Sequence, residues 1–344
     1  MRRRSLLLTV ATALVLAACG VDAASPSPGG NGDGDGDGDQ TIFFGTGSTE
    51  AEAYLVPFLT IGREILSEQG ITLEYIALSS DEAVQAALDR GRVDVALQSS
   101  LGLHRALSAG LSGRFITGLQ QHNPFVLVVP GDVTELSGLE GMRVGIEDPT
   151  SLSVTVAEVL IREQGGLEPG DDYELVALSG SSNRAAALTS GSLDASVLFR
   201  AVGEQVENDS GGDFRIHGGL WDVLDPMLWE GLAASAEFQE NPELAEAFAA
   251  AVLETNRRFY EGDPAEMAAR KDDHPETATL DIDGLIGDFE LWQEIELFPQ
   301  DGGVSEEAFN GITEFLTDAG QLTEDTTVSY EDAVDPSFVD AAQE

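Results

Sequence analysis

Polar side chains and one arginine follow several short apolar runs of this sequence, where predicted strands end. Most are Ser, Thr, Gln or Asn, which exchange hydrogen bonds without reacting. Arg200 directly follows the run "SVLF", where it either pairs bidentately with a carboxylate or sulfonate, or forms a salt bridge to Glu204 along a helix. Such residues indicate reversible binding of a small polar molecule. The candidate binding residues in these turns are Gly47, Ser48, Ser79, Gln98, Ser99, His122, Asn123, Thr150, Ser151, Ser181 and Arg200.

The residue types that catalysis needs are scarce. The four histidines lack the spacing of metal ligands, and His122 is assigned a hydrogen bond to a ligand or to a loop carbonyl. No Gly-x-Ser-x-Gly elbow or phosphate-binding loop occurs. The single lysine, Lys271, lies in the polar segment "ARKDDHP", away from the strand ends, so a Schiff base is not expected. We therefore predict a protein that is not an enzyme and that has neither a cofactor nor a metal site.

A repeat in the sequence predicts the elements that position these residues. "AALDRGRVDVAL" (86–97) and "AALTSGSLDASV" (186–197) align at an offset of 100 residues, so that Gly91 matches Gly191 and Asp94 matches Asp194. In each copy, short apolar runs alternate with segments of helical periodicity, which is the pattern of a parallel sheet with crossover helices. Each glycine is expected just after a helix, in the left-handed conformation. Both copies are predicted to be βαβαβ units.

The arrangement of two such units indicates where a ligand would bind. In parallel sheets, ligands bind beyond the carboxyl ends of the strands, so two facing units form one cleft. The turn 45–48 leads into a helix whose N-terminal N–H groups favour an acceptor or an anion, and the turn 148–151 corresponds to it in the second copy. The predicted fold class is α/β with two lobes, each a mostly parallel sheet with flanking helices.

The N-terminus reads as a targeting segment. Arg2 to Arg4 precede an apolar stretch from Leu6 to Leu16, and the only cysteine, Cys19, follows in "LAAC". This resembles the bacterial lipoprotein signal, with residues 1–18 removed and Cys19 lipidated; in an ordinary secretory signal Cys19 would be incidental. Residues 19–40, rich in Gly and Asp, are predicted to be a disordered tether. The expected location is extracytoplasmic, with a lipid anchor to the cell membrane.

The charge balance excludes some partners. The chain has 17 Lys+Arg and 62 Asp+Glu, a net charge of −45. Removing residues 1–18 takes away three arginines, so the mature chain carries −45 − 3 = −48. Such a charge argues against nucleic acid and against an anionic membrane surface as partners. It is also compatible with a high-salt habitat, where ions screen repulsion between like charges.

Four stretches resemble a known family: "GRVDVALQS", "MRVGIEDPTSLS", "RAAALTSGSLDASVLF" and "NPELAEAFAAAVLETN". They are similar to the type II solute-binding proteins of ABC importers, in the NMT1/THI5-like branch that includes sulfonate, nitrate, taurine and thiamine-precursor binders. The resemblance covers about residues 41–318. It implies a periplasmic-binding-protein-like type II fold with lobe 1 formed by 41–129 and 225–344, and lobe 2 by 130–224. The implied hinge lies near Val128–Gly131 and Gly218–Leu224.

The resemblance also implies residue roles. Thr150 and Ser151 would hold the polar head of the ligand, and Phe199 with Arg200 would lie beside it. Arg200 is the only cation expected within reach, whereas Glu147 and Asp148 at the same mouth would repel a simple anion. A small zwitterion or an uncharged heteroaromatic therefore fits as well as a sulfonate. Trp221 and Trp229 either stack on a flat ligand or pack at the hinge.

The function implied is capture of a small organic solute by a monomeric lipoprotein and its delivery to an ABC permease and ATPase, with the lipid anchor as the membrane contact. Two alternatives stay open. The first is a sensing or adhesion lipoprotein that does not take part in import. The second is an enzyme of the thiamine-precursor type on the same scaffold, which is disfavoured by the lack of a suitable lysine.

Overall fold

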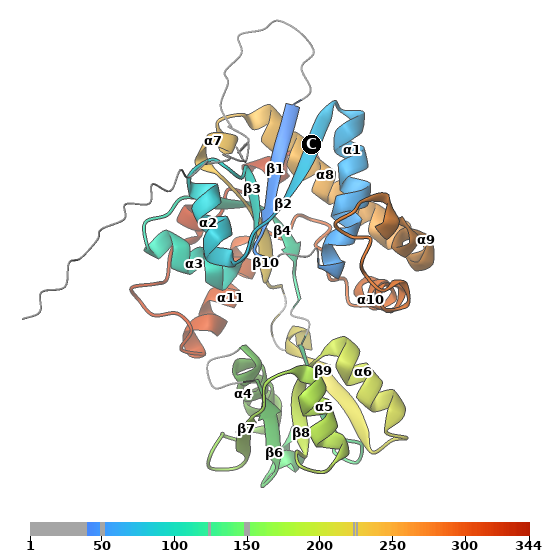
Figure 1. The fold of residues 1–344 in the computed structure, drawn as a ribbon. Coiled ribbons are helices and arrows are strands. Elements are labelled where there is room, and N and C mark those ends of the chain that lie inside the picture. The colour runs from blue at the N-terminus through green and yellow to red at the C-terminus, as the bar shows by residue number, and fades with distance from the viewer. Residues whose placement is uncertain (1–39, 49–51, 123–124, 148–151, 223, 225) are drawn as a thin grey trace, which may run out of the picture. The chain divides into compact units, whose positions relative to one another are not determined.

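We describe the protein from a computed structural model, which covers residues 40–48, 52–122, 125–147, 152–222, 224 and 226–344. The described residues form two five-stranded sheets with flanking helices (Figure 1). In this part of the chain, no helix combines the length and the apolar character needed to cross a membrane. The predicted signal peptide, Cys19 and the tether lie outside the described residues, as do Asn123, Thr150 and Ser151.

The first sheet has the strand order β2-β1-β3-β10-β4. β1 runs parallel to β2 and β3, while β10 runs antiparallel to both β3 and β4. The strands lie at Gln40–Thr46 (β1), Ile71–Ala77 (β2), Val95–Ser99 (β3), Arg114–Gln120 (β4) and Glu230–Ala234 (β10).

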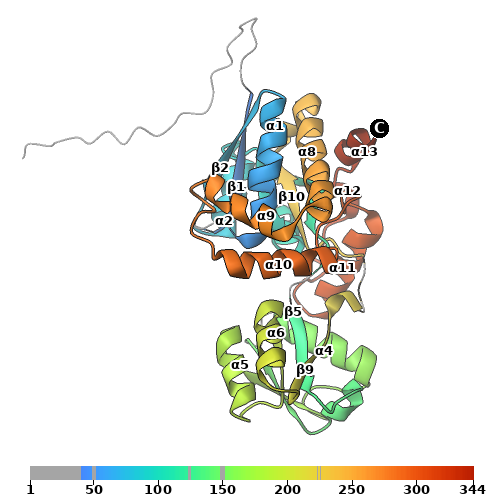
Figure 2. The ribbon, with the colours of Figure 1, turned by 90° about the vertical axis from the view of Figure 1, so that its right-hand side faces the viewer.

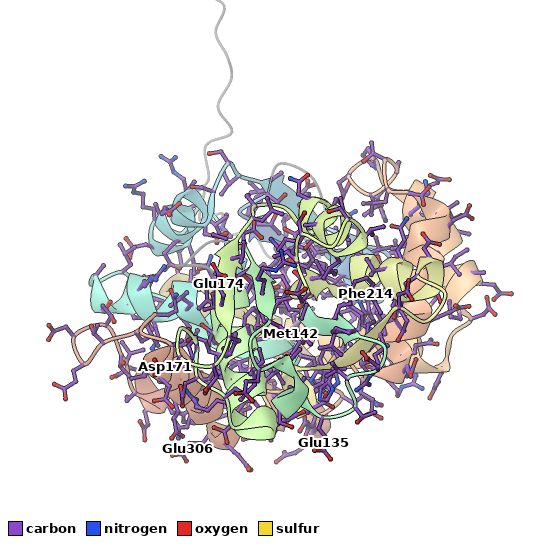
Figure 3. All side chains as sticks on the ribbon, turned by 90° about the horizontal axis from the view of Figure 1, so that it is seen from below. Glu135, Met142, Asp171, Glu174, Phe214 and Glu306 are labelled. Atoms are coloured by element: carbon purple, nitrogen blue, oxygen red, sulfur yellow. The ribbon has the colours of Figure 1, made fainter. Side chains whose placement is uncertain are left out.

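The second sheet has the matching order β7-β6-β8-β5-β9. β6 runs parallel to β7 and β8, and β5 runs antiparallel to β8 and β9. The strands lie at Phe125–Pro130 (β5), Arg143–Ile146 (β6), Glu174–Ala177 (β7), Ala195–Phe199 (β8) and Phe214–Gly219 (β9). Figure 3 views this sheet from the amino ends of its parallel strands, where Met142 and Glu174 are labelled.

The predicted α/β class with mostly parallel sheets is confirmed, because one strand in each sheet runs against the other four. The lobe boundaries at 129/130 and 224/225 stay a prediction. The chain changes from the first sheet to the second between Gln120 and Phe125 and returns between Gly219 and Glu230.

The helices alternate with the strands in the first part of the chain and follow one another after β10. α1 and α8 pack against each other beside the first sheet (Figures 1 and 2). The helices lie at Arg63–Glu68 (α1), Asp81–Asp89 (α2), Ser100–Ser108 (α3), Leu152–Gly165 (α4), Ser181–Thr189 (α5), Arg200–Asp209 (α6), Ala236–Gln239 (α7), Pro242–Glu261 (α8), Pro264–Ala269 (α9), Ile282–Glu294 (α10), Glu306–Asp318 (α11), Tyr330–Ala333 (α12) and Ser337–Gln343 (α13), with short turns at Ala53–Leu55 (η1) and Phe58–Gly62 (η2) before α1.

The repeated Asp performs the same task in both sheets. The Asp94 carboxylate accepts a hydrogen bond from the Phe43 N–H at 2.8 Å, and Asp194 accepts one from the Arg143 N–H at 2.9 Å. In return, the N–H of each Asp donates to the carbonyl of the same partner residue. Each Asp thus ties the start of its strand segment to the neighbouring parallel strand, which explains why the sequence places it at the same offset in both units.

The repeated glycines end the helices before these aspartates. Gly91 has φ +62° and Gly191 has φ +72°, and each follows the C-cap residue of its helix, α2 or α5. This left-handed conformation is strained for residues with a Cβ, so the predicted glycine C-caps are confirmed.

Aromatic packing joins η2 and α8 to strand β1 of the first sheet. Phe58 of η2 lies edge-to-face with Phe44 of β1 at 5.6 Å between ring centroids, and with Phe248 of α8 at 5.3 Å. All three rings are buried. Edge-to-face pairs of this kind add about 0.5–1.5 kcal/mol to the free energy gained by burying their surface. This core holds the strands rigid beneath the turns that carry the candidate site.

Candidate functional site

The predicted binding residues are distributed over the carboxyl-end edges of the two sheets. Gly47, Ser48, Ser79, Gln98, Ser99 and His122 belong to the first sheet or its turns, and Ser181, Phe199 and Arg200 to the second. The two connecting segments meet, since the His122 ring lies 6.2 Å from the Trp221 ring at an interplanar angle of 68°.

The turn after β1 packs closely against the start of α2. A Cβ on Gly47 would collide with the carboxylate and backbone of Asp81 at the start of α2. The Thr46 hydroxyl shares a 2.8 Å hydrogen bond with the Tyr75 hydroxyl of β2 and is within 3.4 Å of the Ser48 carbonyl. Gly47 therefore has a structural reason for its identity, and the turn brings Ser48 to the strand edge.

The serines of the next two turns begin helices. Ser80 accepts a hydrogen bond from the Ala83 N–H and caps α2, while its neighbour Ser79 is exposed at the edge. Ser99 accepts from the Gly102 N–H at 3.1 Å and caps α3. One acceptor position of the Ser99 hydroxyl is therefore used to cap the helix, as is common for Ser and Thr at helix starts.

Gln98, next to Ser99, is the unusual polar residue of this edge. Its side chain is 3% exposed, and its Nε2 has no hydrogen-bond partner within the described part of the chain. Buried amide groups nearly always have partners in folded proteins. His122, which follows β4, is also buried and packs against Trp221.

The second edge is organised by Arg184, a cation that the sequence analysis missed. Its side chain is fully buried in α5. Nε donates to the Val197 carbonyl and Nη1 to the Leu178 carbonyl, each at 2.9 Å, while Nη1 lies 3.4 Å from a carboxylate oxygen of Glu147. Arg184 therefore joins the ends of β7 and β8. Its position in a helix of small residues, "SSNRAAALT", was the available signal.

Ser181 belongs to the same network. Its hydroxyl accepts hydrogen bonds from Arg184 Nη2 at 3.1 Å and from the Phe199 N–H at 3.2 Å. Both acceptor positions of the oxygen are thus used, which leaves its own proton as the group that Ser181 can offer to a ligand.

Phe199 and Arg200 lie together where β8 gives way to α6. Phe199 is 46% exposed and stacks on Phe125 at 4.6 Å. Arg200 forms the salt bridge to Glu204 at 2.9 Å and lies over the Trp221 ring, 5.7 Å from its centroid. The helix salt bridge that the sequence allowed is present, and a ligand contact by Arg200 stays a prediction. Trp221 packs against Arg200 and His122, and Trp229 is buried.

A carboxylic acid that sequence reasoning missed lies in the middle of the first edge. Glu230 opens β10 and is in register with Ser99 of β3 and Gln120 of β4. Burial, reinforced by the charge of Glu52, raises the pKa of Glu230 to about 8, and a hydrogen bond from Tyr54 opposes this rise. The signal in the sequence was an acid directly before the small apolar run "GLAA".

The edges differ in chemistry. The first offers an amide, hydroxyls and a partly buried carboxylic acid, and the second offers a stacked aromatic pair, with Phe199 exposed, beside an arginine. Among the residues that the structure describes, no three His, Cys, Asp or Glu side chains gather closely enough to hold a metal ion. The arrangement provides hydrogen bonds, charge and a flat apolar surface.

Comparisons with solved structures support the fold. The chain is similar to a protein from Methylobacillus flagellatus KT that is assigned as the periplasmic sulfonate-binding protein SsuA (TM-score 0.66, 18% identity, 88% of this chain and 94% of that one). It is also similar to the periplasmic nitrate-binding protein NrtA from Synechocystis PCC 6803 (TM-score 0.59, 14% identity, 88% of each chain). These likenesses confirm the predicted periplasmic-binding-protein type II fold.

An enzyme shares this fold as well. The chain is similar to the C27S mutant of DSZB in complex with biphenyl-2-sulfinic acid (TM-score 0.59, 16% identity, 89% of this chain and 99% of that one). The fold therefore does not separate binding proteins from enzymes.

Sequence comparison identifies the family directly. No curated protein matches the chain. The model of the NMT1/THI5-like family matches residues 66–266, more than half of the 344-residue chain. The matched region includes both repeats and both edges described above, apart from the turn after β1. The chain belongs to the NMT1/THI5-like family.

Proposed function

We propose that the protein is the solute-binding component of an ABC import system. It captures a small organic solute at the carboxyl-end edges of its two sheets and delivers the solute to permease and ATPase subunits. The observation that carries the proposal is the pair of edges, each of which ends in turns lined by hydrogen-bonding groups, with the Phe199 ring exposed on one of them. Family membership and the likeness to sulfonate- and nitrate-binding proteins support it.

The chemistry of the described residues favours binding over catalysis. The only lysine, Lys271, donates to Asp272 at 2.7 Å and to the Ala278 carbonyl at 2.9 Å, in the segment between α9 and α10. A lysine engaged in this way, away from both edges, is poorly placed to form a Schiff base. The only cysteine, Cys19, is the proposed site of lipidation on an extracytoplasmic anchor.

The direct test is to identify the solute. The protein purified without denaturant should release a small molecule that mass spectrometry detects, and protein refolded from urea should rebind that molecule. Cells that lack the gene should then lose uptake of the same molecule, and a plasmid copy should restore it. Binding with unchanged uptake would instead favour the sensing alternative. Chemical conversion of the molecule by the purified protein would favour the enzyme.

Arg200 tests the second edge. If its guanidinium contacts the solute, Arg200→Ala should weaken binding at least about tenfold, because losing a charge-assisted contact costs about 1.4 kcal/mol or more. Arg162→Ala is the matched control, since Arg162 pairs with Glu163 on the exposed side of α4. Equal affinities in calorimetry for both variants would leave Arg200 with the structural role of holding Glu204.

The lipid anchor has its own test. The wild-type precursor should be processed in a globomycin-sensitive way, and the mature protein should partition with membranes. Cys19→Ser should abolish both behaviours. A membrane-bound, processed Cys19→Ser protein would contradict lipidation at this residue.

A further inference from the structure

Glu230 lies at the edge of the first sheet where we propose that the solute binds. Its register with Ser99 and Gln120 places it at the carboxyl ends of β3 and β4. Its Oε2 atom is shielded from solvent and has no hydrogen-bond partner among the described residues. Tyr54 is a hydrogen-bond partner of the same carboxyl group. Oε2 is therefore a shielded acceptor that receives no hydrogen bond from the described residues.

The surroundings of Glu230 are negative. Glu52 and Asp81 act on it through their charges, and Tyr54 is the other titratable group that affects it. None of the ion pairs within the described ranges includes Glu230, Glu52 or Asp81. No described basic residue is among the groups that shift the pKa of Glu230. Glu230 is partly buried, and without a counter-ion its ionised form is destabilised; carboxyl groups perturbed in this way are candidates for functional sites.

Two independent observations at the strand ends point to a bound molecule. Gln98, one residue before Ser99, is 3% exposed and leaves its Nε2 without a partner in the part of the chain described. Phe199 occupies the position equivalent to Ser99 in the second unit, and it is one of the two large apolar side chains that are exposed among the described residues. An unpartnered amide needs a polar atom, and an exposed ring at a strand end offers a flat apolar face.

We propose that the solute carries a positively charged N–H group, such as an ammonium or amidinium, that donates to Glu230, and a flat apolar part that packs on Phe199. This inference rests on the proposed function. A cation supplies both the donor and the counter-charge that Oε2 lacks, whereas a simple anion would meet the charges of Glu52 and Asp81. The binding edge thus selects an organic cation or a zwitterion whose positive end enters beside β10.

Binding of a cation should also move a proton. The pKa of Glu230 is about 8 in the ligand-free protein, so the group is mostly protonated at pH 7. A bound cation favours the carboxylate, and the proton then leaves to solvent. Affinity for a cation should therefore rise by up to about tenfold per pH unit as the pH increases toward 8, and each binding event at pH 7 should release nearly one proton.

The test uses three probes that share one ring and differ in charge: benzamidine, benzyl alcohol and benzenesulfonate. Calorimetry and ligand-observed NMR on the refolded protein at pH 7.5 should rank benzamidine at least about tenfold tighter than benzenesulfonate. Glu230→Gln should weaken benzamidine about 30-fold or more and should abolish proton release, because it removes the charge at nearly constant size. Glu74→Gln, at an exposed position of β2, is the control and should change neither.

The outcomes separate this inference from the proposed function. Tighter binding of benzenesulfonate than of benzamidine, or a benzamidine affinity that Glu230→Gln leaves unchanged, overturns the charge assignment while solute binding stands. A co-purified solute without a basic nitrogen overturns it in the same way. If none of the probes binds and nothing co-purifies, the proposed function fails, and the charge assignment fails with it.

Discussion

Replacing Glu230 by glutamine should stabilise the ligand-free protein. The pKa of Glu230 is about 8 in the fold, against an ordinary value of 4.5. Between these two values the unfolded chain has lost the proton that the folded protein retains. The folded state is therefore penalised progressively as the pH rises from 4.5 to 8, and the full penalty applies above pH 8. Glutamine does not titrate and removes this penalty.

The size of the stability penalty follows from the rise in the pKa of Glu230. One pKa unit corresponds to about 1.4 kcal/mol, so the penalty is about 1 kcal/mol at pH 5, about 3 kcal/mol at pH 7 and about 4 kcal/mol at pH 8. The amide that Glu230→Gln introduces keeps the hydrogen bond to Tyr54 possible. The gain in unfolding free energy should therefore grow with pH, and this pH dependence distinguishes a charge effect from a packing effect.

The assay is urea unfolding of ligand-free wild type and Glu230→Gln at pH 5, 7 and 8. The ionic strength is held constant because the chain carries a net charge of −45. Glu74→Gln controls for the loss of one negative charge from the same sheet, and its effect should vary little with pH. A stability difference between wild type and Glu230→Gln that is the same at pH 5 and pH 8, or a variant that is less stable at pH 8, would refute the reasoning.

Three further measurements probe the framework. Burial lowers the pKa of His104 to about 4, so below pH 6.5 the unfolded chain binds a proton that the folded protein does not bind. The contribution of His104 to stability should therefore fall by about 2 kcal/mol from pH 7 to pH 5, opposite in sign to the contribution of Glu230, and urea unfolding of His104→Gln should lack it. Asp94→Ala and Asp194→Ala should each lower unfolding free energy by about 1–3 kcal/mol, and their effects should add in the double variant because the two residues serve different sheets. Arg184→Met should lower the unfolding free energy by about 2–4 kcal/mol, because the carbonyls of Leu178 and Val197 lose their hydrogen-bond donor. A decrease below about 1 kcal/mol in chemical denaturation would show that water replaces the guanidinium as the donor.

The framework could be predicted because its determinants are local. Gly91 and Gly191 are required by backbone conformation at helix ends. The repeat also aligned Asp94 with Asp194, but their bonds to residues 51 positions earlier appear only in the structure. Each role depends on a few neighbouring elements whose order the sequence already indicates. The cap of α11 is equally local, since the Ser305 side chain accepts from the Ala308 N–H at the start of that helix.

The missed residues depend on contacts between distant segments. Glu230 reaches the first edge because β10 inserts antiparallel between β3 and β4, more than a hundred residues after β4 in the chain. Arg184 appears in sequence as one charge on a short helix, and its burial results from carbonyls at the ends of β7 and β8. Such roles follow from tertiary packing and have no periodic signature.

The shared framework leaves the two strand ends free to diverge. When the two units are aligned at the offset of 100 residues, Gln98 and Ser99 correspond to Leu198 and Phe199. The glycine and the aspartate before these positions are the same in both units. The bonds of the two repeated aspartates lie near the starts of the strands, away from the side chains of these positions. If the solute binds at these edges as proposed, the side chains at positions 98–99 and 198–199 can differ between the units without disturbing the bonds of the two aspartates. Two unlike strand ends on a duplicated scaffold would then favour one orientation of a molecule whose own ends differ.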